Sequence, residues 1–177
     1  MRFPFRVRRP ALPAGAAAAL QLDPAERVLA WSGLVGGGFA VATLDGLRMI
    51  TPQGRRIARP WTDVDHAAWD PDARTLAVWF VGSRATVPLE VEDGTWLAQV
   101  VRDRVDASVL LTSELALPGG AVVRLALRRG PDGSVLDQVV PPPGVDLGDP
   151  GLAPLVRAGI NDLRADAGLD NTGPEPW

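Results

Sequence analysis

The sequence contains no cysteine, no lysine and no tyrosine, and His66 is its only histidine. These absences exclude catalysis by a thiol, a Schiff-base lysine, a P-loop lysine for phosphate, and any metal motif built on two histidines. A serine triad would have to use His66, and the sequence has no Gly-x-Ser-x-Gly nucleophile elbow. The residue types that are missing therefore favour a binding protein over an enzyme.

Long hydrophobic runs are also missing, because the longest fall far short of the roughly 18 apolar residues that a membrane-spanning helix needs. The formal net charge is −3, which argues against nucleic acid as a partner, since nonspecific binding to RNA or DNA relies on basic surface. The start of the chain superficially resembles a secretory signal, but Pro10 and Pro13 interrupt it and Asp23 follows almost at once. The sequence predicts a cytoplasmic protein.

Turn-forming residues and arginine are abundant instead. The 177 residues include 17 prolines and 19 glycines, which indicate many turns, and all 18 basic residues are arginine. Arginine, alanine, glycine and proline have GC-rich codons, so this composition hints at a GC-rich bacterial genome. The length allows one domain or two small ones, with enough chain to bury a core without disulfides or metal.

Short β-prone runs separated by turn signals begin at Arg27 and predict an antiparallel meander or barrel. Asp45-Gly46 predicts a tight hairpin, because this pair tolerates positive φ angles. Residues 76–81 are apolar on both faces and predict a central strand, whereas Pro88 cannot donate to a ladder and predicts an edge. The seven runs are 28–35, 39–44, 47–51, 55–61, 63–69, 76–81 and 86–91.

A helix, a second meander and a second helix are expected to follow. Asp93 has the character of an N-cap, and Asp149-Pro150 has the character of a cap and first helical position. The apolar stripe of the first helix is Trp96, Leu97, Val100, Val101 and Val105. That of the last is Leu152, Leu155, Val156, Ile160 and Leu163. Between them, residues 109–117, 123–127 and 135–140 predict three strands.

These elements divide the chain into four parts. We expect a basic, flexible N-terminal segment over 1–21, a β-barrel with its capping helix over 22–107, a meander with a helix packed on the first part over 108–170, and a tail over 171–177. A three-stranded sheet with one helix is marginal alone. We therefore expect residues 22–107 to fold separately and residues 108–170 to fold poorly without them.

About seven short strands followed by one helix, over roughly residues 26–106, resemble the pleckstrin-homology-like (PH-like) fold in its bacterial, GRAM-like versions. The segments that carry the resemblance are 26–30, 42–48 and 59–64. The rest of the chain, including 101–105 and 107–109, resembles uncharacterised actinobacterial proteins. The resemblance implies an α+β, mostly β protein whose use is noncatalytic recognition of lipid headgroups or protein segments. The loop that is basic in many lipid-binding members is here the uncharged stretch 33–38, which counts against phosphoinositide binding.

Carboxylates and imidazole gather only at Asp63, Asp65 and His66. On a regular strand the two carboxylates would share one face and His66 would point to the other, which separates them as ligands. The pattern predicts an exposed acidic strand with an incidental histidine. The alternative is an enzyme that uses Asp63, Asp65 and Glu90, with or without a divalent cation.

Six tryptophans are present, and five of them fall within the expected barrel and its helix: Trp31, Trp61, Trp69, Trp79 and Trp96. Large aromatic side chains most often fill a core. Trp79 lies on the opposite face of its strand from Leu76, Val78 and Phe80 in our assignment, so Trp79 with Trp61 or Trp69 could instead form an exposed apolar patch. These three tryptophans are the candidate interaction surface.

The N-terminus mixes cations with aromatic residues, the composition of a weak tether to anionic lipid. The alternative is an ordinary disordered terminus. The residues concerned are Arg2, Phe3, Phe5, Arg6, Arg8 and Arg9. Taken together, the sequence predicts a noncatalytic module that binds a protein partner, with weak peripheral contact to the inner face of an anionic membrane. No catalytic, cofactor or metal residue is expected.

Overall fold

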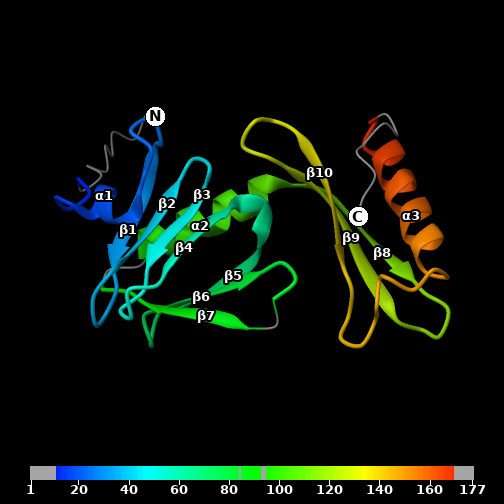
Figure 1. Ribbon diagram of the computed structural model, residues 1–177, viewed down its shortest axis with the longest axis horizontal. Helices are drawn as coiled ribbons and strands as arrows, with labels where there is room; N and C mark the ends of the chain where they lie inside the picture. The colour runs from blue at the N-terminus through cyan, green and yellow to red at the C-terminus, as the bar shows by residue number, and fades with distance from the viewer. Residues whose placement is uncertain (1–10, 84, 93–94, 170–177) are drawn as a thin grey trace, which may run out of the picture.

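The computed structural model describes residues 11–83, 85–92 and 95–169, and this part of the chain is mostly β, arranged in three antiparallel sheets (Figure 1). The strands are β1 (Val28–Gly33), β2 (Phe39–Thr43), β3 (Gly46–Ile50), β4 (Arg56–Pro60), β5 (Val64–Asp70), β6 (Thr75–Phe80), β7 (Thr86–Glu90), β8 (Val109–Ala116), β9 (Val122–Arg129) and β10 (Val135–Val140). The helices are α1 (Ala16–Leu20), the 3-10 helix η1 (Trp61–Asp63), α2 (Thr95–Ser108) and α3 (Ala153–Asp166). All ten strands correspond to expected runs.

The first half, residues 11–108, contains two sheets with the orders β1-β2-β3-β4 and β5-β6-β7. The sheets meet at one corner, where Leu34 and Val91 form a bridge and the amide of Val35 donates to the carbonyl of Glu90 over 2.8 Å. On the other side, β4 passes through η1 into β5 without a ladder between the two strands. The expectation of one closed barrel is therefore wrong, because the strands divide between two sheets. The predicted central position of β6 and edge position of β7 are confirmed.

One core fills the space between these sheets and α2. Leu47 and Met49 of β3, Leu76 and Val78 of β6, and Val101 of α2 are all buried in it. The helical stripe predicted for α2 is buried except for Trp96, which is 46% exposed. The predicted N-cap, Asp93, lies outside the described residues.

The hairpin between β2 and β3 forms where Asp45-Gly46 predicted it, but for another reason. Gly46 belongs to β3, and it is not among the glycines with positive φ. A Cβ at position 46 would instead collide with the carbonyl oxygen of Arg59 on β4. Glycine is needed there for the close approach of two strands, not for a left-handed turn.

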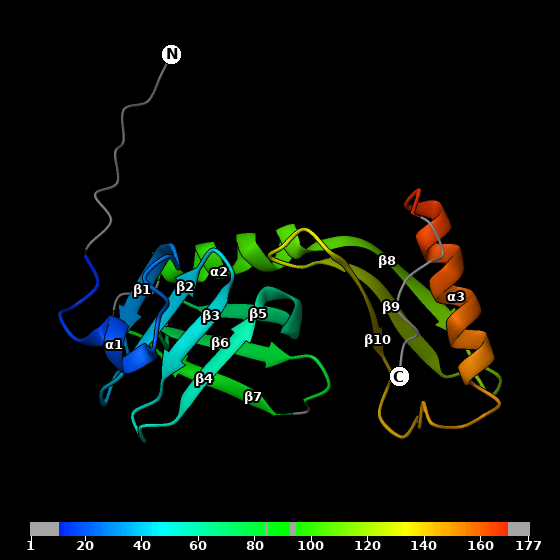
Figure 2. The ribbon, with the colours of Figure 1, turned by 45° about the horizontal axis from the view of Figure 1, so that its top comes forward.

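The second half, residues 109–169, is the sheet β10-β9-β8 with α3 against one face (Figure 2). Val123, Leu125 and Leu127 alternate along β9 toward this core. Gly159 lets α3 approach closely, since a Cβ there would press on Leu125. The helix begins at Ala153, later than Asp149-Pro150 predicted, and Leu155 of the predicted apolar stripe is 39% exposed.

Two further findings concern the N-terminal part and the membrane. Within the expected N-terminal segment, residues 16–20 form α1, in which Ala16 and Leu20 are buried. Within the described part of the chain, no helix combines the length and the apolar character needed to cross a bilayer.

Candidate functional site

The two halves meet where η1 lies against β9 and β10. The Arg128 Nη2 of β9 donates to the carbonyl oxygens of Trp61 and Val64, over 2.7 Å and 2.6 Å. The Gln138 Nε2 of β10 donates to the carbonyl oxygen of Thr62 over 2.9 Å. Side chains of the second half thus bind three backbone carbonyls of the first, and α2 leads directly into β8 (Figure 2). These contacts hold the two halves in one relative position.

Arg128 is the central residue of this junction. It is only 2% exposed. Burial lowers the pKa of its guanidinium, and the nearby carboxylate of Asp65 opposes that shift. Its Nε atom has no hydrogen-bond partner among the described residues. Arg128 therefore carries a buried charge whose hydrogen bonds go to neutral carbonyls. Because a buried charge is costly without such partners, the burial of Arg128 depends on the junction being formed.

Beside Arg128, four side chains form a second contact between the halves. A β-bulge between Val64 and His66 interrupts the alternation of β5. As a result the Nδ1 of His66 lies 2.9 Å from the Oδ2 of Asp65, whose Oδ1 pairs with Arg124 of β9. The His66 ring stacks on Trp79, with 4.3 Å between ring centroids and 12° between planes. The prediction that Asp65 and His66 separate to opposite faces is wrong, because it assumed a regular strand.

This cluster borders a groove between the halves, with a volume of about 360 Å³. Aromatic side chains of β6 form one wall, and a run of three prolines after β10 forms the other. The lining residues are Asp65, Trp79, Phe80, Val81, Gly82, Ser83, Val140, Pro141, Pro142, Pro143, Gly144 and Val145. We call this the interhalf groove. Its walls come from both halves, so its shape depends on the junction.

The three tryptophans proposed as an interaction surface occupy three different environments. Trp61 is 4% exposed, and its Nε1 donates to the carbonyl oxygens of Thr43 and Leu44, so it is a core residue and cannot contact a partner. Trp69 is half-buried against the core of the first half. Trp79 is half-buried and lines the interhalf groove. The structure therefore does not bring the three together as one patch.

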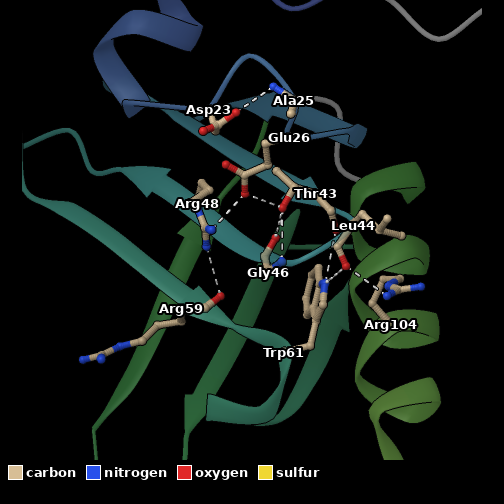
Figure 3. A network of polar contacts seen from close by, with 10 residues as sticks. All are labelled: Asp23, Ala25, Glu26, Thr43, Leu44, Gly46, Arg48, Arg59, Trp61 and Arg104. Atoms are coloured by element: carbon tan, nitrogen blue, oxygen red, sulfur yellow. Dashed lines mark hydrogen bonds and ion pairs between the residues drawn. The ribbon is translucent and has the colours of Figure 1, made fainter. Parts of the chain in front are cut away.

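A polar network around the β2–β3 hairpin fixes Trp61 (Figure 3). The Thr43 hydroxyl donates to Glu26 over 2.8 Å, and Arg48 pairs with the same Glu26 oxygen over 2.9 Å. The Leu44 carbonyl accepts from Trp61 and also from Arg104 of α2, over 2.9 Å. These contacts explain the position of Trp61 and η1. The Nε of Arg104 has no hydrogen-bond partner among the described residues, and the network borders a second cavity of about 320 Å³ that residues 129–131 of the second half also line.

The carboxylates of the alternative enzyme hypothesis are not gathered in one place. Asp63 lies 3.7 Å from Arg59, whereas Asp65 pairs with Arg124 and His66. Glu90 is exposed at the far end of the same sheet, opposite Thr75. Among the residues that the structure describes, no three His, Asp or Glu side chains are close enough to hold a metal ion.

Sequence reasoning missed the residues that make the groove and its junction, namely Arg124, Arg128, Gln138 and the prolines 141–143. One signal was available, because Arg124 and Arg128 lie four residues apart on one face of a strand in which Arg129 is the only other charged residue. The N-terminal cations and phenylalanines proposed as a tether lie outside the described residues. Comparison with known proteins finds no family model, no curated protein and no solved structure that matches this chain.

Proposed function

We propose that this chain is a noncatalytic module that binds an extended segment of a partner protein in the interhalf groove. One observation carries the proposal: the groove is lined by Trp79, Phe80 and three consecutive prolines, and its two walls come from the two halves that the junction joins. A site whose walls are already in place loses little conformational entropy when it binds.

The chemistry of the groove indicates what it accepts. Aromatic rings and proline rings offer apolar surface, and the prolines have no amide hydrogen to leave unpaired. Its volume of about 360 Å³ is at the small end of ligand pockets and suits one or two apolar side chains of an extended peptide. Arg124 pairs with Asp65, one of the lining residues, and its side chain remains 45% exposed, so it offers a cation next to the groove. We therefore infer an apolar or aromatic anchor residue, with a polar or acidic neighbour.

The order of elements in the first half supports this assignment. Seven strands in two sheets, followed by α2, keep the order on which the PH-like resemblance rests, and the resemblance implies recognition rather than catalysis. We propose that the first half is a PH-like module whose barrel is left open between β4 and β5, and that the second half adds the proline wall of the groove.

The proposal can be tested by selecting peptides from a display library with the immobilised full chain. Selected peptides should lose about tenfold or more in affinity for Trp79→Ala, because a central aromatic anchor dominates small interfaces. Trp96→Ala, which removes an exposed tryptophan distant from the groove in sequence and fold, should leave binding unchanged. Trp96→Ala should melt near the temperature of the wild type, and Trp79→Ala should remain folded but melt lower because it loses the stacking on His66. Failure to select any peptide, or equal binding to Trp79→Ala, would contradict the proposal.

We further propose that residues 2–9 add weak contact with an anionic membrane, with the arginines attracted to the surface and Phe3 and Phe5 entering the interface. The full chain should then sediment with anionic vesicles at low salt and detach as salt rises, because screening shortens the Debye length from about 30 Å at 0.01 M to about 8 Å at 0.15 M. Removal of residues 1–10 should abolish sedimentation. Equal behaviour of the two proteins, or no sedimentation of either, would show that there is no tether.

A further inference from the structure

Each sheet of this protein has two outer strands, and an outer strand offers unpaired backbone groups to any other strand. Proteins usually protect such edges with proline, positive charge, a bulge or a covering element. Most of the outer strands here carry one of these devices. β1 and β5 are both bulged; the end of β1 is bonded to the end of β7, and β5 packs against α2. β4 carries Arg56, Arg59 and Pro60, and β7 carries Pro88. β10 runs into the prolines and binds the first half through Gln138.

β8 differs from the others over most of its length. Its one bulge lies at the start, between Val109 and Leu111, and leaves residues 111–116 regular. These six residues contain no proline and no positive charge, and Glu114 is their only ionisable side chain. Thr112, Ser113, Glu114 and Ala116 are exposed. Among the described residues, nothing outside the ladder with β9 bonds to the backbone of β8.

The helix beside this edge also presents apolar surface. Gly159 of α3 faces Leu125 of β9 and, slightly farther away, Leu115 of β8, whereas Arg164 pairs with Asp137 of β10. Leu155 precedes Arg164 by nine residues, two and a half turns of helix, and therefore lies on the flank away from β10. It is 39% exposed. The free edge and an exposed leucine thus belong to the same side of the second half.

We propose that β8 pairs antiparallel with β8 of a second copy of this chain, which joins two three-stranded sheets into one of six strands. A two-fold axis in an antiparallel pair must pass between residues that face their own equivalents. An axis at Ser113 places Leu111 opposite Leu115 of the other copy, and Thr112 opposite Glu114. Apolar side chains then meet apolar ones, and the two Glu114 carboxylates do not face each other.

The choice of a second copy, rather than a foreign strand, rests on this self-complementarity. The regular part of β8 is nearly symmetric in chemistry about Ser113, with a leucine two positions away on each side. The acidic side chain on one side faces a hydroxyl on the other and meets no like charge. The interhalf groove is lined by residues that follow β10, and β10 and β8 are the two opposite outer strands of this sheet, so both groups of contacts can form at once.

The test uses Ser113, because the axis brings this exposed residue opposite itself. Sedimentation velocity of the full chain should show a particle of twice the 18.7 kDa chain mass at high concentration. Ser113→Lys and Ser113→Glu should each remain single chains, since like charges would face each other. An equal mixture of the two variants should recover the paired particle, because lysine then faces glutamate. This rescue distinguishes lost pairing from lost folding.

The matched control is Ala58→Lys. It adds the same charge to β4, an exposed outer strand that is already protected, and it should associate like the wild type. A wild type that stays a single chain at every concentration would overturn the proposal. So would a Ser113→Lys variant that pairs as well as the wild type, since a second copy would then use another surface. If β8 binds only strands of other proteins, the wild type will stay a single chain, and this result would also overturn the proposal.

Discussion

Arg128 offers the sharpest test of how the two halves are held together. In Arg128→Ala the carbonyls of Trp61 and Val64 both lose the guanidinium. The Trp61 carbonyl keeps the backbone amide of Val64 as a donor, so the Val64 carbonyl is the acceptor left without a partner. An unpaired buried acceptor costs about 1–3 kcal/mol, and the lost second bond to Trp61 adds about 0.5–1.5 kcal/mol. Removing a poorly solvated cation returns part of that loss. We expect a net decrease of about 1–3 kcal/mol in the free energy of unfolding.

Arg128→Met isolates the contribution of side-chain volume. Methionine, like alanine, removes the charge and the donor to the Val64 carbonyl, but it restores much of the side-chain volume. It should therefore be less destabilising than alanine, because the cavity is smaller. Arg129→Ala is the matched control, since Arg129 is the next residue on β9 and is exposed, and its free energy of unfolding should change by no more than about 0.5 kcal/mol.

The assay can also show whether the halves unfold together. In a Trp177→Phe background, every remaining tryptophan belongs to the first half, so fluorescence reports that half while far-ultraviolet circular dichroism reports both. The two denaturation curves should coincide for the parent and separate for Arg128→Ala. Coincident curves with a loss below about 1 kcal/mol would refute the view that Arg128 couples the halves, because that loss is smaller than one unpaired buried carbonyl requires.

Three further outcomes are expected. Trp61→Ala should lower the free energy of unfolding by about 3–5 kcal/mol because it empties a buried site, whereas Trp96→Ala should change it by at most about 0.5 kcal/mol; denaturant titration measures both. Gly46→Ala should cost about 1–3 kcal/mol in the same assay, because its Cβ would overlap the neighbouring strand, and an unchanged midpoint would contradict that clash. The hydroxyl and amide of Ser134 hold the pKa of Asp132 below its ordinary value of 3.8. The stability that the ionised Asp132 contributes through these bonds is fully present above pH 3.8 and is lost as the pH falls through the lowered pKa. The difference in melting temperature between the wild type and Ser134→Ala should therefore shrink in acid. A difference that stays constant with pH would show that the carboxylate does not contribute.

The strands were predictable because alternation and turn residues are local signals. Val123, Leu125 and Leu127 identify β9 and its core face by their spacing alone, and Pro88 identifies β7 as an edge. Each of these signals depends on the properties of one strand. The partner of a strand, and hence the closure of a barrel, depends on where β4 and β5 lie in space, which no local pattern contains.

The site could not be predicted for the same reason. Asp65 meets Arg124 across 59 positions of sequence, and the bulge that aims Asp65 and His66 at each other has no glycine to announce it. Trp61 shows the opposite error. Its candidacy for the surface rested on residue type, whereas its burial follows from the carbonyls that receive its indole hydrogen.

The junction also has a consequence for how the chain can diverge between species. The first half contributes main-chain oxygens of residues 61, 62 and 64, which every amino acid possesses, whereas the second half contributes the specific side chains of Arg128 and Gln138. Selection on the junction should therefore act unequally on its two sides. When homologues are aligned, positions 128 and 138 should drift slowly, and position 62 should vary as far as its own packing allows. Slower change at positions 128 and 138 than at position 62 would indicate that the two halves evolve together and are not recombined separately with other domains.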